Sequence, residues 1–220
     1  MIDFAKKRKL GSLLALLVLL AFTSCLKEGD NASILLNDPQ DIPLITDYLP
    51  EDLLQMFGEE HVNFGDQPPI VDMEFVSNHE YVATSLEPPF APPVGTITPI
   101  KRYHKISQQY LQIADYYSMS SEETSCRLLS PVYMTGHDSY FTVYYFEEPD
   151  TDGKPVHAAL FSGRLTSAGI RDFRYGYKIV RYNDSIVPPT VYPANSIFIF
   201  KDHDGLAEKE TWFDESLLEP

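Results

Sequence analysis

The sequence predicts an all-β protein, with a single antiparallel β-barrel or β-sandwich domain of about 8–10 strands and one or two short helices over residues 46–220. In residues 173–180, large apolar or aromatic side chains occupy the odd positions, and arginine, glycine, lysine and valine occupy the even positions. This period of two is typical of a strand with one buried face. Tyr140–Phe146 (YFTVYYF) has the aromatic and β-branched composition of a central strand. Asp152-Gly153 and Asp204-Gly205 supply turn residues between strand-like segments.

The first element of the domain is predicted to be a short helix. Pro50 suits the first turn of a helix, Glu51 and Asp52 suit its positive end, and Gly58 suits its exit. Because two helical turns are not stable alone, we expect this helix to plug one end of a larger core. The preceding residues 25–45 are polar with scattered aliphatic side chains, and they predict a linker.

The next segment is rich in proline and then becomes ambiguous. Residues 87–99 (EPPFAPPVGTITP) predict a stiff loop that crosses one end of the sheet. In residues 97–117 the spacing of apolar side chains fits a helix, whereas the residue types fit two β segments. The β character of the surrounding segments favours the two strands.

A first hairpin is predicted near the middle of the chain. Residues 148–155 (EPDTDGKP) have turn chemistry, and Val156–Leu165 resumes a strand-like run. The following residues 166–172 predict one turn of helix, with Thr166 or Ser167 as its cap.

A second hairpin is predicted near the C-terminus. Ser196–Lys201 is strand-like, Asp202–Gly205 has the residues of a turn, and the chain is expected to return through Thr211–Phe213. Two hairpins in one small domain favour an antiparallel sheet.

The N-terminus predicts a signal peptide over residues 1–24. A basic start at residues 6–9 precedes the apolar Leu10–Phe22, which is shorter than the roughly 20 residues that a bilayer-spanning helix needs. Phe22-Thr23-Ser24 leads directly into Cys25, and this junction resembles the lipobox of bacterial lipoproteins. The resemblance implies cleavage before Cys25, a thioether-linked diacylglycerol on its sulfur and, usually, a third acyl chain such as palmitate on its amine. The alternative is an ordinary signal peptide beside a chance cysteine.

Lys27-Glu28-Gly29-Asp30 is similar to the lysine and acidic patch that follows the lipidated cysteine in surface-exposed lipoproteins of Bacteroidota. The alternative is an ordinary solvated tether. The expected location is therefore the outer membrane, with the protein lipid-anchored through Cys25 and either exposed on the cell surface or facing the periplasm.

Longer stretches carry a wider resemblance. LPEDLLQMFGEEHVNFGDQPPIVDMEF, YFTVYY, FSGRLTSAGIRDF and FIFKDHDGLAEK occur in this order, and with them the chain resembles a group of uncharacterised Bacteroides-type lipoproteins. Related sequences usually carry an acid, a glycine and an aromatic residue after the paired prolines, whereas Met73 and Glu74 precede Phe75 here. The resemblance implies an exported, mostly β domain, and it implies no activity.

Charge and cysteine content exclude some functions. Residues 1–24 contain four basic residues and one acidic residue, so their removal changes the formal charge from −15 to −18 over the remaining 196 residues. Such a chain repels nucleic acid and anionic headgroups, and no nucleic-acid partner is expected. Once Cys25 is lipidated, Cys126 has no intramolecular cysteine partner, and a buried structural cysteine is favoured over a nucleophile.

No metal or cofactor site is predicted, because the usual metal and nucleotide motifs are missing. The six histidines are scattered, and each is expected to be a surface or hydrogen-bonded residue. The two Asp-x-Asp-Gly sequences are expected to form hairpin turns rather than calcium loops. The carboxylate pairs Asp72/Glu74 and Glu147/Glu148 are the kind that could act on a glycan, but spacing in sequence assigns no role to either.

Two function hypotheses remain. The first is a non-catalytic lipoprotein that binds a glycan or another small ligand in an aromatic-lined concavity, because sugar rings pack on aromatic faces and the chain has 14 tyrosines and 13 phenylalanines. The alternative for these residues, which is favoured, is that they simply fill a β core. The second is a structural or adhesive component whose β edges or acidic surface contact other envelope proteins. A hydrolase is less favoured, since the sequence identifies no nucleophile and base, and no catalytic residue is assigned.

Overall fold

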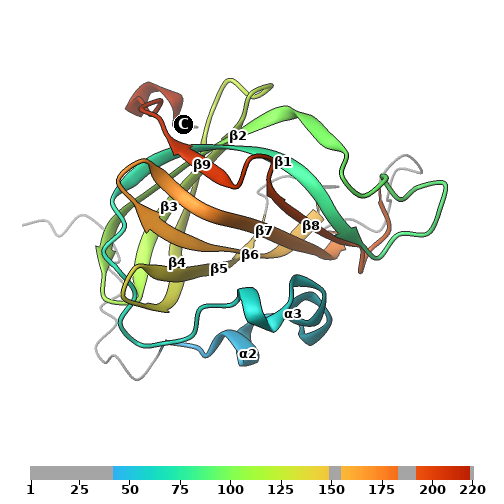
Figure 1. Ribbon diagram of the computed structural model, residues 1–220, viewed down its shortest axis with the longest axis horizontal. Coiled ribbons are helices and arrows are strands. Elements are labelled where there is room, and N and C mark those ends of the chain that lie inside the picture. The colour runs from blue at the N-terminus through green and yellow to red at the C-terminus, as the bar shows by residue number, and fades with distance from the viewer. Residues whose placement is uncertain (1–41, 149–154, 183–191, 219–220) are drawn as a thin grey trace, which may run out of the picture. The chain divides into compact units, whose positions relative to one another are not determined.

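The computed structural model describes residues 42–148, 155–182 and 192–218 (Figure 1). These residues form nine β-strands, two short α-helices and two single 3₁₀ turns, which confirms the all-β prediction. The helices are α2 (Ile45–Tyr48) and α3 (Glu51–Phe57). The strands are β1 (Met73–Thr84), β2 (Ile97–Tyr110), β3 (Ile113–Ser120), β4 (Arg127–His137), β5 (Tyr140–Glu147), β6 (Pro155–Thr166), β7 (Gly169–Tyr182), β8 (Ile197–Asp202) and β9 (Leu206–Lys209).

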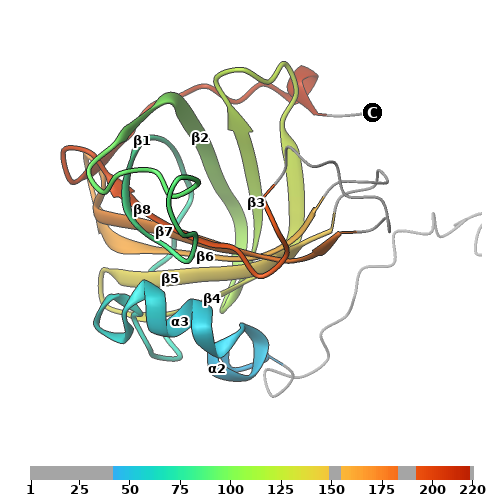
Figure 2. The ribbon, with the colours of Figure 1, turned by 90° about the vertical axis from the view of Figure 1, so that its right-hand side faces the viewer.

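The sheet closes into a barrel. Each strand from β2 to β7 pairs antiparallel with the next along the chain, and β1 pairs with both β8 and β2. Seen from the side view of Figure 2, the strands curve around a common interior. The sequence left a barrel and a sandwich open, and the pairing of β1 with both neighbours identifies the barrel.

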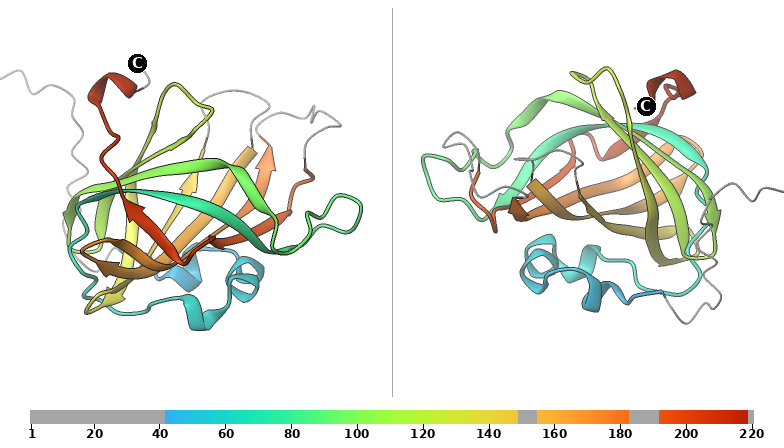
Figure 3. Two further views of the ribbon diagram at one scale, coloured as in Figure 1. Left: turned by 45° about the horizontal axis from the view of Figure 1, so that its top comes forward. Right: turned by 180° about the vertical axis from the view of Figure 1, so that it is seen from behind.

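The predicted second hairpin is wrong, because β8 and β9 do not pair with each other. Both run antiparallel to β1, β8 beside residues 79–84 and β9 beside Phe75 and Val76, and both also pair with β7 (Figure 3). They are therefore two halves of one strand position that is interrupted at residues 203–205. The segment Thr211–Phe213 is not a strand. Its Trp212 and Phe213 amides instead donate to one carboxylate oxygen of Glu74, at 2.8 and 3.0 Å.

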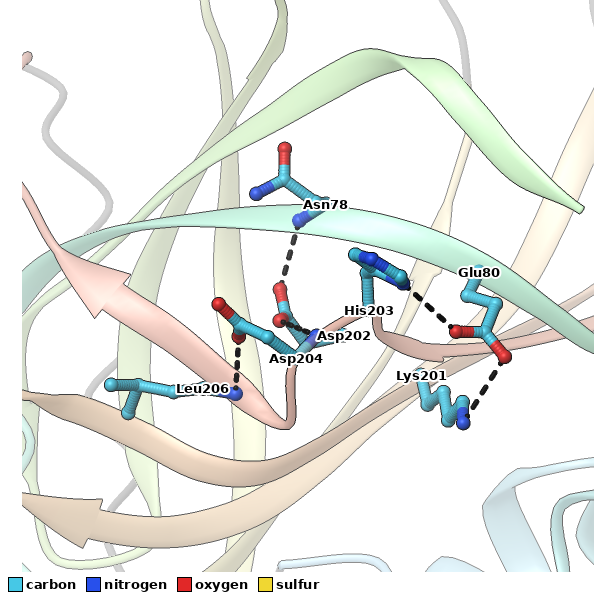
Figure 4. Close-up of polar contacts among 7 residues, drawn as sticks. All are labelled: Asn78, Glu80, Lys201, Asp202, His203, Asp204 and Leu206. Atoms are coloured by element: carbon cyan, nitrogen blue, oxygen red, sulfur yellow. Dashed lines mark hydrogen bonds and ion pairs between the residues drawn. The ribbon is translucent and has the colours of Figure 1, made fainter. Parts of the chain in front are cut away.

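Asp202 stabilises this interruption (Figure 4). Its carboxylate accepts hydrogen bonds from the backbone amides of Asn78 (2.8 Å) and Asp204 (3.2 Å), while the His203 amide donates to the Asn78 carbonyl (2.8 Å). Gly205 has a φ of +82°, a conformation that glycine adopts without strain. The second Asp-x-Asp-Gly sequence is thus a bulge within a strand, and its aspartate replaces a missing backbone acceptor.

The helices cover the outer face of the barrel (Figures 1 and 3). The prediction that the helix after Pro50 plugs one end of the core is therefore wrong. Leu53, Leu54 and Phe57 pack with outward-facing side chains of β5, β6 and β8. Gly176 of β7 leaves room for this contact, because a Cβ there would lie 2.9 Å from a Phe57 ring carbon. Lys178, on the same outer face of β7, bonds the Asp52 carboxylate at 2.6 Å. This covering buries both faces of β5 and explains the nearly continuous apolar run in Tyr140–Phe146.

Residues 166–172 are a strand turn, not the predicted helical turn. Thr166 pairs with Gly169, so only two residues connect β6 to β7. Gly169 has a φ of +142°, and a Cβ there would lie 2.1 Å from the Ala207 carbonyl oxygen. This close approach of β9, which comes from far along the sequence, requires glycine at position 169, directly after the two-residue turn.

The other strand predictions are confirmed. Residues 97–117 form parts of β2 and β3 rather than a helix, and β5 pairs with β6 as a hairpin. Its predicted turn, with the first Asp-x-Asp-Gly sequence, lies largely outside the described residues. The proline-rich loop ends before Ile97, so its last predicted residues belong to β2.

The two ends of the barrel differ. At one end, which we call the closed end, β2–β3, β4–β5 and β6–β7 are each joined by two residues. Its interior is filled by apolar side chains, among them Phe75, Ile106, Met134, Phe141 and Phe161. At the opposite end, which we call the open end, β1–β2, β3–β4, β5–β6 and β7–β8 are joined by longer segments.

Candidate ligand-binding cavity

A cavity of about 230 Å³ lies in the interior of the barrel toward its open end. Alternate residues of a strand face the same side, so four strands each contribute two lining residues that are two positions apart. The lining residues are His79, Arg102, His104, Tyr116, Ser118, Glu123, Arg127, Tyr145, Glu147, His157, Tyr175 and Tyr177. Unlike the closed end, this part of the interior carries ionisable and hydroxyl groups from seven strands, β1 to β7, and from the β3–β4 loop.

His104 is buried and has a partner for each ring nitrogen. Its Nε2 lies 2.8 Å from the Ser77 hydroxyl oxygen, and its Nδ1 lies 2.6 Å from the Tyr116 hydroxyl oxygen. Phe75 stacks on the imidazole, with ring centroids 4.7 Å apart. Burial lowers the pKa of His104 well below its usual value, and nearby His79 and Arg102 lower it further. The neutral ring donates through one nitrogen and accepts through the other.

His79 is equally buried but lacks such a partner. Its ring stacks against Tyr175 and Phe200, with centroids 5.3 and 5.0 Å away. Among the described residues, no group hydrogen-bonds the buried Nε2 atom. Burial, together with the charge of Arg102, lowers the pKa of His79 to about 3, so the ring is neutral. A buried polar atom without a partner destabilises a fold, and this one belongs to a side chain that lines the cavity.

Four tyrosines supply hydroxyl groups to the same space. Burial raises the pKa of Tyr175 to about 12 and raises the pKa values of Tyr116, Tyr145 and Tyr177 as well. All four are therefore neutral at physiological pH, and each hydroxyl can donate and accept a hydrogen bond. Tyr177 also stacks nearly parallel to Phe198 and Phe200, so the cavity has an aromatic wall.

An ion-pair network occupies one side of the cavity. Arg127 pairs with the Glu147 carboxylate and lies 3.8 Å from Glu123, and His157 Nδ1 lies 3.6 Å from the other Glu147 oxygen. Burial alone would raise the pKa of Glu147, but the hydrogen bond and charge of His157 and the charge of Arg127 lower it to about 2. Glu147 and Arg127 thus neutralise each other.

Arg102 is the cavity cation that lacks this compensation. It lies on β2, exposed at the cavity mouth, and within the part of the chain that the structure describes it forms no ion pair. Its charge lowers the pKa values of His79 and His104, and it partly offsets the increase that burial causes in the pKa of Tyr175. Arg102 is therefore electrostatically coupled to the interior of the cavity although it is open to solvent.

The candidate residues from the sequence lie mostly elsewhere. Cys25 lies outside the described residues. Cys126 is fully buried, as expected for a structural cysteine. The described ranges hold no cluster of three potential metal ligands. In the pair Asp72/Glu74, Glu74 bonds Trp212 and Phe213 as described. In the pair Glu147/Glu148, only Glu147 faces the cavity, while Glu148 bonds Arg181 outside it at 2.8 Å.

Sequence reasoning missed the buried histidines. All six were expected at the surface or hydrogen bonded, which is correct for His104 and wrong for Nε2 of His79. The alternation along β1 and β2 was the available signal. His79 lies four positions after the buried Phe75, and His104 lies two positions before the buried Ile106, so each histidine shares the inward face of its strand. That period predicts which face they share, but not that the two strands are neighbours.

In comparisons with known proteins, no family model, curated protein or solved structure matches this chain. Within the described ranges, no helix has the length and apolar character needed to cross a membrane.

Proposed function

We propose that this protein is a lipid-anchored envelope protein that binds a small ligand, such as a glycan fragment, in the barrel cavity without catalysing a reaction. The observation that carries the proposal is the convergence of paired inward residues from β2, β3, β5 and β7 on one cavity. Binding sites for small molecules are typically concave and combine aromatic surface with a few placed polar groups. The closed end of the same barrel has no such lining, because its interior is packed with apolar side chains.

We propose the absence of catalysis from the position of the three residues that most resemble a catalytic arrangement. Ser77, His104 and Tyr116 are hydrogen bonded in a row, which is the order of a nucleophile, a base and an orienting residue. However, the Ser77 side chain is fully buried and does not line the cavity. A substrate in the cavity would meet His104 and Tyr116 but not the serine oxygen, so the row is better suited to holding the interior together.

The anchor is proposed from the sequence at Cys25. Two or more acyl chains hold a protein stably at a membrane, because each buried methylene contributes about 0.8 kcal/mol. We expect the Cys25→Ser protein to lose incorporation of labelled fatty acid and to leave the membrane fraction. Continued labelling of that variant would overturn the anchor. Protease treatment of intact cells then distinguishes a location on the cell surface from a location on the periplasmic face of the outer membrane.

The closed barrel weakens one form of the adhesive alternative. Each described strand has a neighbour on both sides, since β1 closes the sheet and β9 lies between β1 and β7. Proteins that add a strand to a sheet need a free edge. Contacts with other envelope proteins would therefore have to use side chains.

The ligand proposal is tested with the mature chain that begins at position 25 and carries Cys25→Ser. A panel of glycan fragments and small acids is screened by thermal unfolding, because a ligand that binds only the folded state raises the melting temperature. We expect a concentration-dependent rise for at least one class of compound. No rise across the panel, together with a protein that copurifies from the envelope, would favour the adhesive alternative.

A further inference from the structure

The cavity carries polar groups that could select one class of ligand. Its mouth carries the uncompensated Arg102, and its inner wall carries His79, whose side chain is only 4% exposed and whose Nε2 has no hydrogen-bond partner among the described residues. Ser118 and Tyr177 line the same space with hydroxyl groups. A ligand that satisfied all of these groups would need an anionic end and several hydroxyl groups.

We infer, on the basis of the proposed binding function, that the cavity takes a small hydroxylated carboxylic acid, such as an acidic monosaccharide, with its carboxylate on Arg102 and a hydroxyl group on His79. A guanidinium presents two parallel N–H groups that match the two oxygens of a carboxylate. The sugar ring then packs on the aromatic wall that contains Tyr175 and Tyr177.

Charge on the rest of the molecule makes Arg102 decisive. The mature chain is strongly acidic and repels anions in general. The second arginine of the cavity, Arg127, is already paired with Glu147 and Glu123. An acidic ligand therefore depends on Arg102.

The inner wall argues against a fatty acid, which would also offer a carboxylate. An alkyl chain in this cavity would cover Nε2 of His79 and the tyrosine hydroxyl groups without bonding them, and each buried group left without a partner weakens binding. A cavity of about 230 Å³ is also smaller than the roughly 300–1,000 Å³ typical of sites for drug-sized ligands. Both facts favour a compact, hydroxylated ligand.

The test uses the mature Cys25→Ser chain and three probes, namely glucuronate, glucose and octanoate, titrated by calorimetry. We expect glucuronate to bind at least about tenfold more tightly than glucose, which lacks the carboxylate for a charge-assisted bidentate contact with Arg102. We expect the same margin over octanoate, which has the carboxylate but leaves Nε2 of His79 and the tyrosine hydroxyl groups without partners. Arg102→Gln should weaken glucuronate binding about tenfold or more. The matched control is Arg181→Gln, since Arg181 is exposed and pairs with Glu148 away from the cavity, and it should leave binding unchanged.

A second variant separates a ligand contact from a structural role. His79→Phe keeps the stacking but removes Nε2, so it should weaken glucuronate binding several-fold while leaving the protein at least as stable. If glucose binds as tightly as glucuronate and Arg102→Gln changes neither, the acid inference is wrong and the binding function stands. Binding of octanoate alone would also overturn the inference. If all three probes and the wider panel fail to bind, both proposals fail.

Discussion

The two ends of the barrel are built from the same eight strand positions, yet they have opposite interiors. At the closed end the connections are short and the inward side chains are apolar, so the space is filled. At the open end the inward positions of the same strands carry arginine, histidine, tyrosine and glutamate, and a cavity remains. The comparison indicates that one end stabilises the fold and the other end holds the groups suited to binding.

The largest expected effect is at the closed end. Phe161 is fully buried and packs against Phe75, Tyr116 and Phe173, with ring centroids 5.2 to 6.2 Å away. Phe161→Ala should destabilise the protein by about 3–5 kcal/mol, because it leaves a cavity in a packed core. Urea denaturation measures the loss. At the open end, Tyr177→Phe removes only a hydroxyl group and should change the free energy of unfolding by less than about 1 kcal/mol; equal losses would contradict the division between the ends.

The next effect concerns the ion-pair network of the open end. The pKa of Glu147 in the folded protein is about 2, below its ordinary value of 4.5, so the charged carboxylate stabilises the fold above pH 4.5. This contribution is lost as the pH falls from 4.5 toward 2. Glu147→Gln should therefore cost about 3 kcal/mol at pH 7 and much less near pH 2.

Urea denaturation at several pH values measures this dependence. The control is Glu148→Gln, because Glu148 is exposed and its ion pair with Arg181 should contribute less than about 1 kcal/mol. If Glu147→Gln lost the same stability at pH 7 and pH 2, the ion pairs would not be its cause.

The two buried histidines should respond in opposite directions. His104→Phe leaves the Ser77 and Tyr116 hydroxyl groups without their partner, and it should destabilise the protein by about 2 kcal/mol. His79→Phe removes an unsatisfied nitrogen and should stabilise the protein by about 1 kcal/mol. Thermal unfolding of the two variants at pH 7 compares them directly. A loss of stability in His79→Phe would show that the imidazole of His79 stabilises the fold, contrary to the expectation from its unsatisfied nitrogen.

The smallest effect concerns Asp202, at the interruption between β8 and β9. Burial raises the pKa of Asp202 from 3.8 to about 6, so this carboxyl group costs the fold stability as the pH rises from about 4 to about 6, and the cost stays constant above pH 6. Asp202→Asn keeps an oxygen for the Asn78 amide and avoids a buried charge, and it gives up only the longer hydrogen bond of 3.2 Å from the Asp204 amide. It should stabilise the protein by about 1 kcal/mol at pH 8 and have no effect below pH 4. A destabilised variant at pH 8 would mean that the charge strengthens the Asn78 hydrogen bond more than burial weakens it.

The sequence predicted what depends on local pattern. Alternation identified the strands at Phe173–Val180 and Tyr140–Phe146, and the proline, acidic residues and glycine identified α3. The errors arose where a distant segment determines the structure. Gly169 begins β7 after a two-residue turn with β9 passing beside it, and the Asp202 segment is a bulge because β1 and β7 continue past it. The cavity was also not predicted, because its residues come from seven strands and no local pattern gives the order of those strands around the barrel.

The most direct test of a ligand site at the open end is to fill the cavity and measure the ligand-induced rise in melting temperature. Ser118→Trp places an indole in the cavity, whereas Tyr110→Trp changes a side chain that is 75% exposed near the closed end. For any compound that stabilises the unmodified mature chain, we predict that Ser118→Trp abolishes the rise and Tyr110→Trp keeps it. A full rise in a folded Ser118→Trp protein would contradict a ligand site in the barrel cavity.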